Sequence, residues 1–240
     1  MSTPPNLDLL VLGAHPDDAE VHVGGLLALA SRRGLKAGIL DVTAGDLGTR
    51  GTAALRNQEA MAAARILGVQ RIILDFPDAR FDEGEAYRIA VMEQLRTLRP
   101  RVLVMSHFDD HHPDHRRIHR IGREAAYYAG LRNYPCQGEP FRPEAVAWVG
   151  GVNPPTPPDL AVDVSEVWAT RMAAFDAFGS QFTQDPSLPQ TRIAHPSFRR
   201  GIEGRAMHWG SLLGCDFAEG LWCEKPVAPA LLEFLAKLKA

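Results

Sequence analysis

The chain has 240 residues, 45% of them hydrophobic, and its formal net charge at pH 7 is −3. This composition supplies a large apolar core, which excludes a disordered chain, and its slightly acidic balance excludes a broad basic face for nucleic acid. No apolar run approaches the roughly 18 residues of a membrane span, and residues 1–6 lack the basic and apolar regions of a secretory signal. A cytoplasmic protein without nucleic-acid or membrane partners is therefore expected.

Strands and helices alternate over the first 106 residues. Apolar runs predict strands at 7–12, 36–42, 71–76 and 102–106. Helix-forming runs between them predict helices at 21–33, 53–67 and 85–98, the second ended by Gly68 and the third by Pro100. This alternation predicts an α/β fold, a Rossmann-like, doubly wound and mostly parallel sheet with helices on both faces.

The second half of the chain continues with weaker signals. We expect helices at 118–129, 167–178, 203–213 and 230–239, and strands at 145–150 and 160–164. A proline-rich loop at 153–158 is the best candidate for a domain boundary. The 80 or so residues after it have too few core elements to fold alone, so one domain over residues 1–240 is expected.

Polar clusters follow two of the predicted strands. His15, Asp17 and Asp18 come after the first strand, in a turn that lacks the GxGxxG spacing of a dinucleotide site. A second cluster, 107–115, follows the fourth strand and holds four histidines and three aspartates. The first and fourth strands are neighbours in a doubly wound sheet, so the two clusters should face each other at its carboxyl edge.

The types of residue in these clusters suggest a catalytic metal site. Two imidazoles and one carboxylate around an open position are the donor set of a catalytic zinc ion, whose fourth place is left for water. His15 and Asp18 can chelate one ion from a tight turn, and His115 can complete the set from the opposite loop.

Longer stretches of the chain resemble the LmbE-like, or PIG-L-like, zinc N-deacetylases. The resemblance lies in HPDDAE at 15–20, GG at 24–25 and HPDH at 112–115. It extends to GTRGT at 48–52, RNQEA at 56–60, ARILG at 64–68, SQ at 180–181 and GCDFAEG at 214–220. Among the branches of this family, the chain is most similar to the deacetylase of bacillithiol biosynthesis, which acts on N-acetylglucosaminyl-malate.

The resemblance implies a role for individual residues. Asp17 would be the general base that takes a proton from the zinc water and passes it to the departing amine. His112 would stay protonated and stabilise the oxyanion, and Arg56 would grip the substrate, plausibly by a carboxylate. The zinc ligands would be His15, Asp18 and His115.

Other polar residues near the clusters have a structural and a functional interpretation. For Asp109 and Asp110 we favour a solvated turn or helix cap, whereas Asp114 is expected to orient an imidazole. His107 and His111 are left open between the site and the scaffold. Relatives often have Arg at the position of His111.

Two arginines and a glycine pair are also candidates. Arg50 lies in a glycine-rich loop, where we favour substrate contact over a surface charge. Arg56 stands at a helix start, where a cation opposes the macrodipole, so a functional reason is expected. Gly24 and Gly25 lie within a helical pattern at a cost of about 1 kcal/mol each, which predicts close packing beneath the site.

The resemblance implies a zinc-dependent hydrolase that removes acetyl from an N-acetylglucosamine conjugate, with N-acetylglucosaminyl-malate as first choice. N-acetylglucosamine and diacetylchitobiose are the alternatives, since no counterpart of the family's substrate-contacting Tyr is found at 191–200. From other classes, a non-haem Fe(II) oxygenase would share the donor set but has no use for Asp17. A catalytically silent sugar-binding protein stabilised by its metal also remains. A small amino-sugar partner is expected, and the resemblance implies a homo-oligomer.

Overall fold

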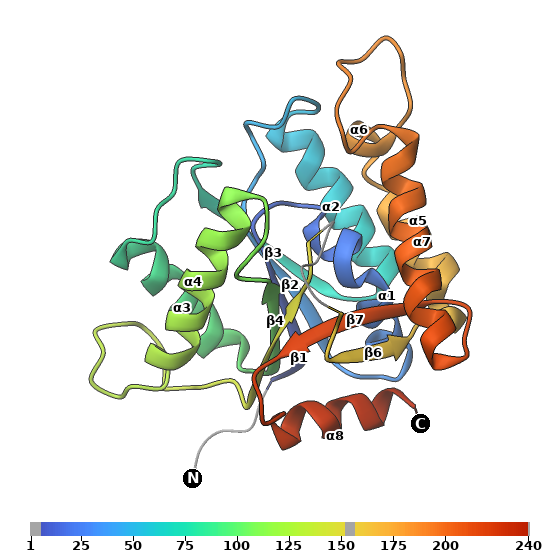
Figure 1. The fold of residues 1–240 in the computed structure, drawn as a ribbon. Coiled ribbons are helices and arrows are strands. Elements are labelled where there is room, and N and C mark those ends of the chain that lie inside the picture. The colour runs from blue at the N-terminus through green and yellow to red at the C-terminus, as the bar shows by residue number, and fades with distance from the viewer. Residues whose placement is uncertain (1–5, 152–156, 240) are drawn as a thin grey trace.

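The computed structural model describes residues 6–151 and 157–239. A seven-stranded sheet runs through the middle of the molecule in the order β3-β2-β1-β4-β5-β7-β6 (Figure 1). Its strands are β1 Leu7–Gly13, β2 Ala37–Thr43, β3 Gln70–Phe76, β4 Pro100–Ser106, β5 Ala145–Val149, β6 Leu160–Asp163 and β7 Ala218–Cys223.

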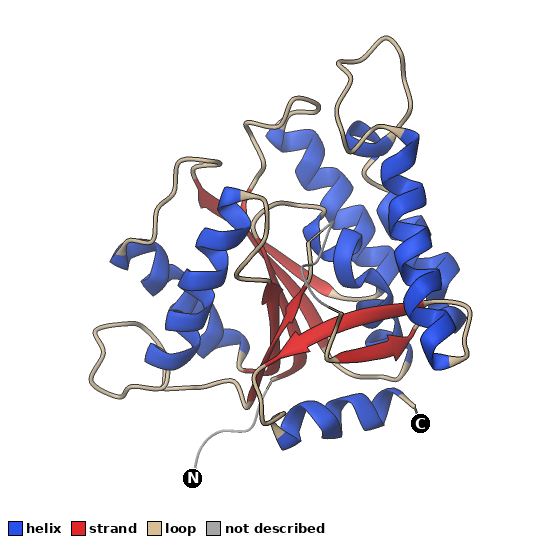
Figure 2. Cartoon of the chain, in the orientation of Figure 1, coloured by secondary structure: helices blue, strands red, loops and turns tan. Residues whose placement is uncertain are grey.

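Helices cover both faces of this sheet, with α3 and α4 on one face and α1, α2, α5 and α8 on the other (Figures 1 and 2). Within the described part of the chain, none of these helices has both the length and the apolar character needed to cross a bilayer. The helices are α1 Asp18–Arg32, α2 Ala53–Leu67, α3 Glu85–Leu98, α4 Pro113–Tyr128, the 3₁₀ turn η1 Ser165–Val167, α5 Trp168–Asp176, α6 Gly179–Phe182, α7 Pro196–Leu213 and α8 Pro229–Leu238.

The central strands are buried on both sides because successive residues point to opposite faces of the sheet. In β1, Leu9 and Val11 pack into the core beneath α1, α2 and α8, whereas Leu10 and Leu12 pack into the core beneath α3 and α4. Strands β1 to β5 pair in parallel, and β1 lies directly beside β4. The predicted mostly parallel α/β fold is confirmed, including the neighbouring first and fourth strands.

The other edge of the sheet departs from the prediction. Strand β7 was not predicted, and it pairs antiparallel with both β5 and β6. Helices α4 and α7 begin at Pro113 and Pro196, earlier than the expected 118 and 203. In both, an imidazole caps the helix: His112 and His195 accept a hydrogen bond from a backbone amide two residues on. Histidine is not among the usual N-cap residues, so these starts were missed. The loop predicted at 153–158 falls mostly outside the described residues.

Candidate active site

The turn after β1 is strained and tightly tied. Asp17, which precedes α1, has a backbone φ of 125°, a conformation that residues other than glycine rarely adopt. The Oδ2 atom of Asp18 accepts hydrogen bonds from the amides of Ala14 and His15, each at 2.9 Å. Such strain persists only where the surroundings enforce it, and it is often found at functional sites. The turn therefore fixes both aspartates, with the Oδ1 atom of Asp18 still free of backbone contacts.

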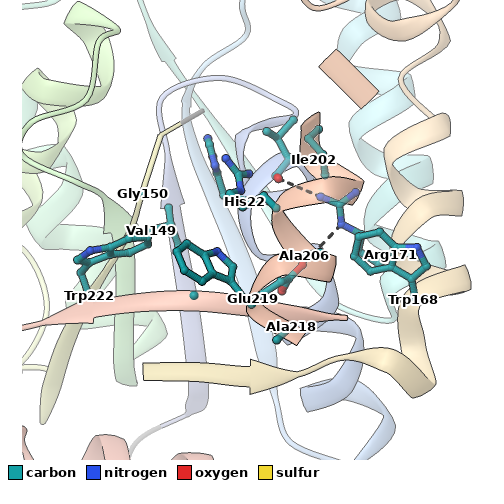
Figure 3. A pocket seen from close by; sticks show the side chains of 14 residues that line it. His22, Val149, Gly150, Trp168, Arg171, Ile202, Ala206, Ala218, Glu219 and Trp222 are labelled. Carbon is teal, nitrogen blue, oxygen red and sulfur yellow. Dashed lines mark hydrogen bonds and ion pairs between the residues drawn. The ribbon is translucent and has the colours of Figure 1, made fainter. Parts of the chain in front are cut away.

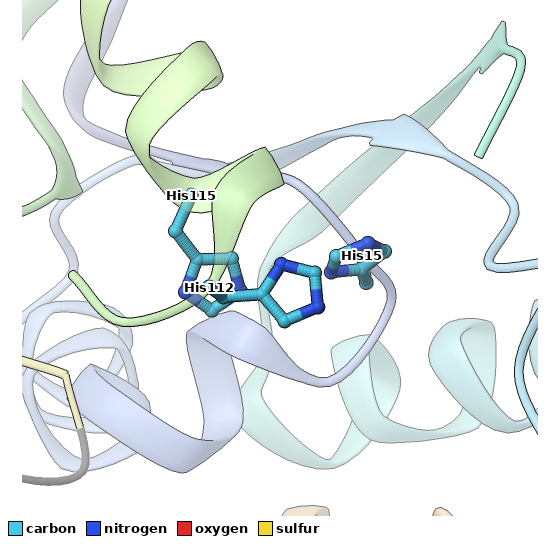
Figure 4. Close-up of side chains that lie close together, drawn as sticks. All are labelled: His15, His112 and His115. Atoms are coloured by element: carbon cyan, nitrogen blue, oxygen red, sulfur yellow. The ribbon is translucent and has the colours of Figure 1, made fainter. Parts of the chain in front are cut away.

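Imidazoles from the start of α4 meet the imidazole of this turn. Figure 4 shows His15 facing His112 and His115, which come from the other polar cluster. Each of the three offers a ring nitrogen within 4.8 Å of the others. His115 Nε2 lies 3.1 Å from Asp18 Oδ1, and His15 Nδ1 lies 3.7 Å from Asp18 Oδ2. The two clusters thus converge at the carboxyl edge of the sheet. Among the described residues, the donor groups whose atoms all lie within 4.8 Å of one another are His15 with His112 and His115, and His15 with Asp78 and Asp114; Asp18 lies beside the first group.

Buried carboxylates stand behind the two imidazoles that flank Asp18. His15 Nε2 lies 3.3 Å from Asp114 Oδ2 and 3.2 Å from Asp78 Oδ1. His115 Nδ1 lies 3.1 Å from Asp110 Oδ2. A carboxylate on one ring nitrogen orients the ring and leaves the other nitrogen for a metal. Asp114 has the place expected of a residue that orients an imidazole.

The expectation for Asp110 was wrong, and a further carboxylate was missed. Asp110 is 3% exposed and is not part of a solvated turn, whereas its neighbour Asp109 is exposed as expected. Asp78 lies in the loop after β3, and its other oxygen accepts a hydrogen bond from the Leu47 amide at 2.9 Å. No motif marks Asp78, because its partner is 63 positions away in the sequence.

In this cluster, burial and neighbouring charges shift the pKa values of three groups. Burial alone would lower the pKa of His15, but the hydrogen bond to Asp114 and the other nearby carboxylates hold it well above its usual value. Burial likewise opposes the charge of His115, and Asp18 raises the pKa of His115 to about 9. Burial would raise the pKa of Asp18, but His115 holds it well below its ordinary value. The site therefore concentrates positive charge around a buried carboxylate, an arrangement in which a divalent cation can replace the protons.

His112 differs from the other two imidazoles. Its Nδ1 accepts a hydrogen bond from the Asp114 amide at 3.2 Å, so this nitrogen has no proton and Nε2 has one. Burial and the neighbouring charges of His115 and His15 lower the pKa of His112 to about 4. The expectation that His112 stays protonated was wrong. A neutral ring can still donate a hydrogen bond from Nε2, although His112 also belongs to the group of three imidazoles whose nitrogens lie close enough together to hold a metal ion.

The guanidinium of Arg56 is bound within the protein. Its Nη2 donates to Asp17 Oδ2 at 3.0 Å and to the Pro16 carbonyl at 2.7 Å, and its Nη1 donates to the Gly45 carbonyl at 3.0 Å. The side chain is buried at the base of the cavity. Burial raises the pKa of Asp17 to about 6, against the opposing charge of Arg56. The guanidinium of Arg56 thus holds Asp17 and the turn, and a substrate contact for Arg56 stays a prediction.

Arg50 is likewise engaged by the protein. Its Nε donates to the Pro189 carbonyl at 2.5 Å and its Nη1 donates to the Thr183 carbonyl at 2.8 Å. The Gln181 side chain donates to the Arg50 carbonyl at 2.8 Å. The guanidinium of Arg50 thus binds the loop that joins α6 to α7, which we call the 183–195 loop. Arg50 also lines the cavity, and its Nη2 has no hydrogen-bond partner among the described residues, so a substrate contact for Arg50 stays a prediction.

The site opens into a cavity of about 370 Å³. Its walls include Asp17, the imidazoles, residues 191–193 of the 183–195 loop, and Phe198 of α7. His111 lines the cavity with its Nδ1 3.1 Å from Asp110, whereas His107 stacks on Phe108 outside it. Of the two histidines left open by the sequence, His111 belongs to the site and His107 to the scaffold.

Helix α1 is broken directly behind the site. Val23 has non-helical dihedral angles, and Glu219 of β7 accepts hydrogen bonds from the amides of Gly25 and the following residue at 2.9 and 2.7 Å. Arg171 donates to the Val21 carbonyl at 3.0 Å and lies 3.6 Å from Glu219 (Figure 3). A Cβ atom on Gly25 would lie 2.8 Å from Val164 Cβ and 2.9 Å from Glu219 Oε1, and a Cβ atom on Gly24 would lie 3.1 Å from Arg171 Cγ. The predicted close packing at the glycine pair is confirmed, and its cause is these three side chains.

Known proteins resemble this chain in sequence and structure. A family model described as PIG-L, GlcNAc-PI de-N-acetylase, matches residues 10–126. The structure of the conserved protein TT1542 from Thermus thermophilus is 38% identical, with a TM-score of 0.84, covering 92% of this chain and 96% of that one. A diacetylchitobiose deacetylase of Thermococcus kodakarensis is 29% identical, covering 89% of this chain and 81% of the relative. A 4-oxalmesaconate hydratase of Pseudomonas putida is 28% identical, covering 97% of this chain and 93% of the relative.

Proposed function

We propose that this chain is a de-N-acetylase of the PIG-L type, which hydrolyses the N-acetyl group of an N-acetylglucosamine conjugate with the help of zinc. N-acetylglucosaminyl-malate is the first choice of substrate. The observation that carries the proposal is the convergence of His15, Asp18 and His115 beside Asp17 in one cavity. Amide hydrolysis needs an activated water, a proton shuttle and a donor for the oxyanion, and each need has a candidate here.

The proposed zinc ligands are His15, Asp18 and His115. Two imidazoles and one carboxylate match the donor set of catalytic zinc, and each imidazole has its other nitrogen against a carboxylate. When bound, zinc supplies a water whose pKa is lowered to about 7.

Asp17 is the proposed proton shuttle. Its carboxylate adjoins the ligand Asp18 in the sequence, and its Oδ2 is held by Arg56, which leaves Oδ1 for the attacking water. Asp17 accepts a proton from that water and delivers it to the departing amine nitrogen. Such a shuttle is typically worth about 10²–10⁴-fold in rate.

His112 is the proposed oxyanion donor. Its Nδ1 is occupied by the Asp114 amide, so its Nε2–H is the group that can donate to the amide oxygen of the substrate. Removal of one such donor costs roughly 2.7–4 kcal/mol in other enzymes. Here the donor is a neutral imidazole fixed at the start of α4.

Acetate release tests the proposal directly. The purified protein is incubated with N-acetylglucosaminyl-malate, N-acetylglucosamine and diacetylchitobiose, each with and without a chelator. We expect release that is fastest with the malate conjugate and absent with the chelator. Faster release from diacetylchitobiose would support the alternative suggested by the Thermococcus relative. No release from any of the three would overturn deacetylation.

A second candidate is hydration of an unsaturated carboxylic acid. It is favoured by the Pseudomonas hydratase, which is similar over 97% of this chain. The same donors would then activate water for addition to a double bond, with no amine to protonate. Adding 4-oxalmesaconate to the panel and following its absorbance distinguishes the two: hydration without acetate release favours this candidate.

A further inference from the structure

Among the described residues, the walls of the cavity contain one arginine whose guanidinium has no hydrogen-bond or ion-pair partner at all. Arg50 and Arg56 line the cavity, but their guanidinium groups donate to backbone carbonyls and to Asp17, which leaves only Arg50 Nη2 and Arg56 Nε without a partner. His111 faces Asp110. Arg192 also lines the cavity, is exposed, and forms no ion pair or side-chain hydrogen bond with any residue in 6–151 or 157–239. Of the described arginines in the wall, Arg192 is therefore the one whose whole guanidinium is open to a ligand.

The negative charges of the cavity do not compete for it. Asp17 faces Arg56, and Asp18 faces His115. The carboxylates of Asp78 and Asp114 both face His15. An anion that enters the cavity away from the metal ligands therefore meets Arg192 without a carboxylate partner to displace.

Arg192 is held in place by its loop. The guanidinium of Arg50 ties the carbonyls of residues 183 and 189, and the Arg192 carbonyl accepts a hydrogen bond from the His195 amide at 3.3 Å. The next residue, Ile193, packs against the apolar cluster that contains Phe198. Little backbone ordering is therefore needed when a ligand binds, which favours affinity.

We propose that Arg192 selects substrates with a carboxylate on the group attached to the amino sugar. Arginine offers a planar fork of donors that matches a carboxylate, and the 183–195 loop presents this fork in the same cavity as the reacting groups. The inference rests on the proposed function, because it assumes that the reacting amide lies at the metal site. It predicts a preference for acidic over neutral conjugates.

Binding is tested apart from turnover with a ligand that cannot be cleaved. Glucosyl-malate has both carboxylates but no amide, and its dimethyl ester has the same skeleton without charge. Calorimetry measures the affinity of the zinc-loaded protein for both ligands. It is carried out on the wild type, Arg192→Gln, Arg192→Lys and Arg200→Gln. Arg200 is exposed on α7 outside the cavity, so its variant removes the same charge without touching the proposed contact.

The wild type is expected to bind the acid roughly tenfold more tightly than the ester, a factor that corresponds to about 1.4 kcal/mol. Arg192→Gln should abolish this preference, Arg192→Lys should retain part of it, and Arg200→Gln should retain all of it. A preference that survives in Arg192→Gln, an equal weakening of both ligands, or no preference in the wild type would each overturn the inference. Acetate release from N-acetylglucosaminyl-malate, N-acetylglucosamine and diacetylchitobiose is measured in parallel with the wild type. Release from any of the three decides the proposed function whatever the calorimetry shows.

Discussion

Two regions build this cavity in different ways. The first, at the ends of β1 and β4, has its polar groups within a few positions of one another, such as His15 beside Asp18 and His112 beside His115. The second, from α6 to β7, is connected to the rest of the fold by single contacts between residues far apart in the sequence. For example, Glu59 accepts hydrogen bonds from the amide and the hydroxyl of Ser180, both at 2.6 Å. The first region contains the groups proposed for chemistry, and the second supports and shapes them. The predictions below separate these two contributions.

Metal removal should have the largest effect, and it acts on the first region alone. Chelation is expected to reduce acetate release to background, because no other group in the site lowers the pKa of water to about 7. Adding zinc should restore it, with metal content followed by elemental analysis. Activity that persists in metal-free protein would contradict the zinc proposal.

Asp17→Asn should separate chemistry from metal binding. We expect kcat to fall by about 10²–10⁴, because the variant cannot accept a proton, while the zinc content stays the same. Asp109→Asn, an exposed residue after β4, is the matched control and should change neither. If Asp17→Asn instead lost its metal and recovered activity with added zinc, the roles of Asp17 and Asp18 would be reversed.

Glu219→Gln tests the second region through stability. Glu219 is buried, accepts two amides of α1 and lies beside the guanidinium of Arg171. Loss of its charge leaves Arg171 buried without a counter-ion, which should lower the free energy of unfolding by about 3 kcal/mol in urea titration. Glu203→Gln removes a half-buried partner of Arg199 and should cost less than about 1 kcal/mol. Equal effects would mean that the buried carboxylate has no special role.

Arg56→Lys distinguishes positioning from substrate binding. Lysine keeps the charge beside Asp17 but cannot reach the Pro16 and Gly45 carbonyls at once as the fork does. We expect kcat to fall roughly tenfold with KM within about twofold of the wild type. A raised KM with unchanged kcat would support the prediction of a substrate contact.

The smallest effect concerns pH and His119, beneath the end of β4. Burial, with nearby cations, lowers its pKa to about 4, and its Nδ1 contacts the Ser106 carbonyl at 2.7 Å. Because the folded pKa lies below the unfolded value of about 6.5, the stability contributed by neutral His119 is complete above pH 6.5 and is lost as pH falls toward 4. Between pH 7 and 5.5 the free energy of unfolding should drop by about 1 kcal/mol from this group. His119→Asn should remove that part of the pH dependence, whereas exposed His208→Asn should not.

The features that could be predicted from the sequence are those that depend on residues close together in the chain. The alternation of apolar runs indicated the parallel strands, and the neighbouring positions of β1 and β4 brought His15 and His115 together. Gly68 ends α2 in the left-handed conformation, as its position suggested. Each of these features follows from residues close together in the chain or from a general rule of sheet topology.

The remaining features depend on partners that the sequence does not link. Asp78 and Asp110 look like ordinary loop aspartates until the fold places them against imidazoles. Arg50 and Arg56 are of a residue type that often binds substrate. The backbone carbonyls that accept their hydrogen bonds cannot be recognised in the sequence, because every residue has one. Glu219 was noticed only as part of a motif, because its amide partners lie 193 and 194 positions earlier.

The carboxylate of Glu219, which accepts hydrogen bonds at the break in α1, also has a consequence for the order in which the protein folds. All proposed metal ligands lie within the first 115 residues, yet the helix that leads away from their turn is completed by Glu219 of β7. During synthesis on the ribosome, the proposed ligands emerge long before the strand that supports the helix behind them. A truncated chain that ends before β7 would keep the hydrogen bonds within the ligand turn, but its broken helix would lack the carboxylate of Glu219, so full ordering of α1 belongs to the last stage of folding.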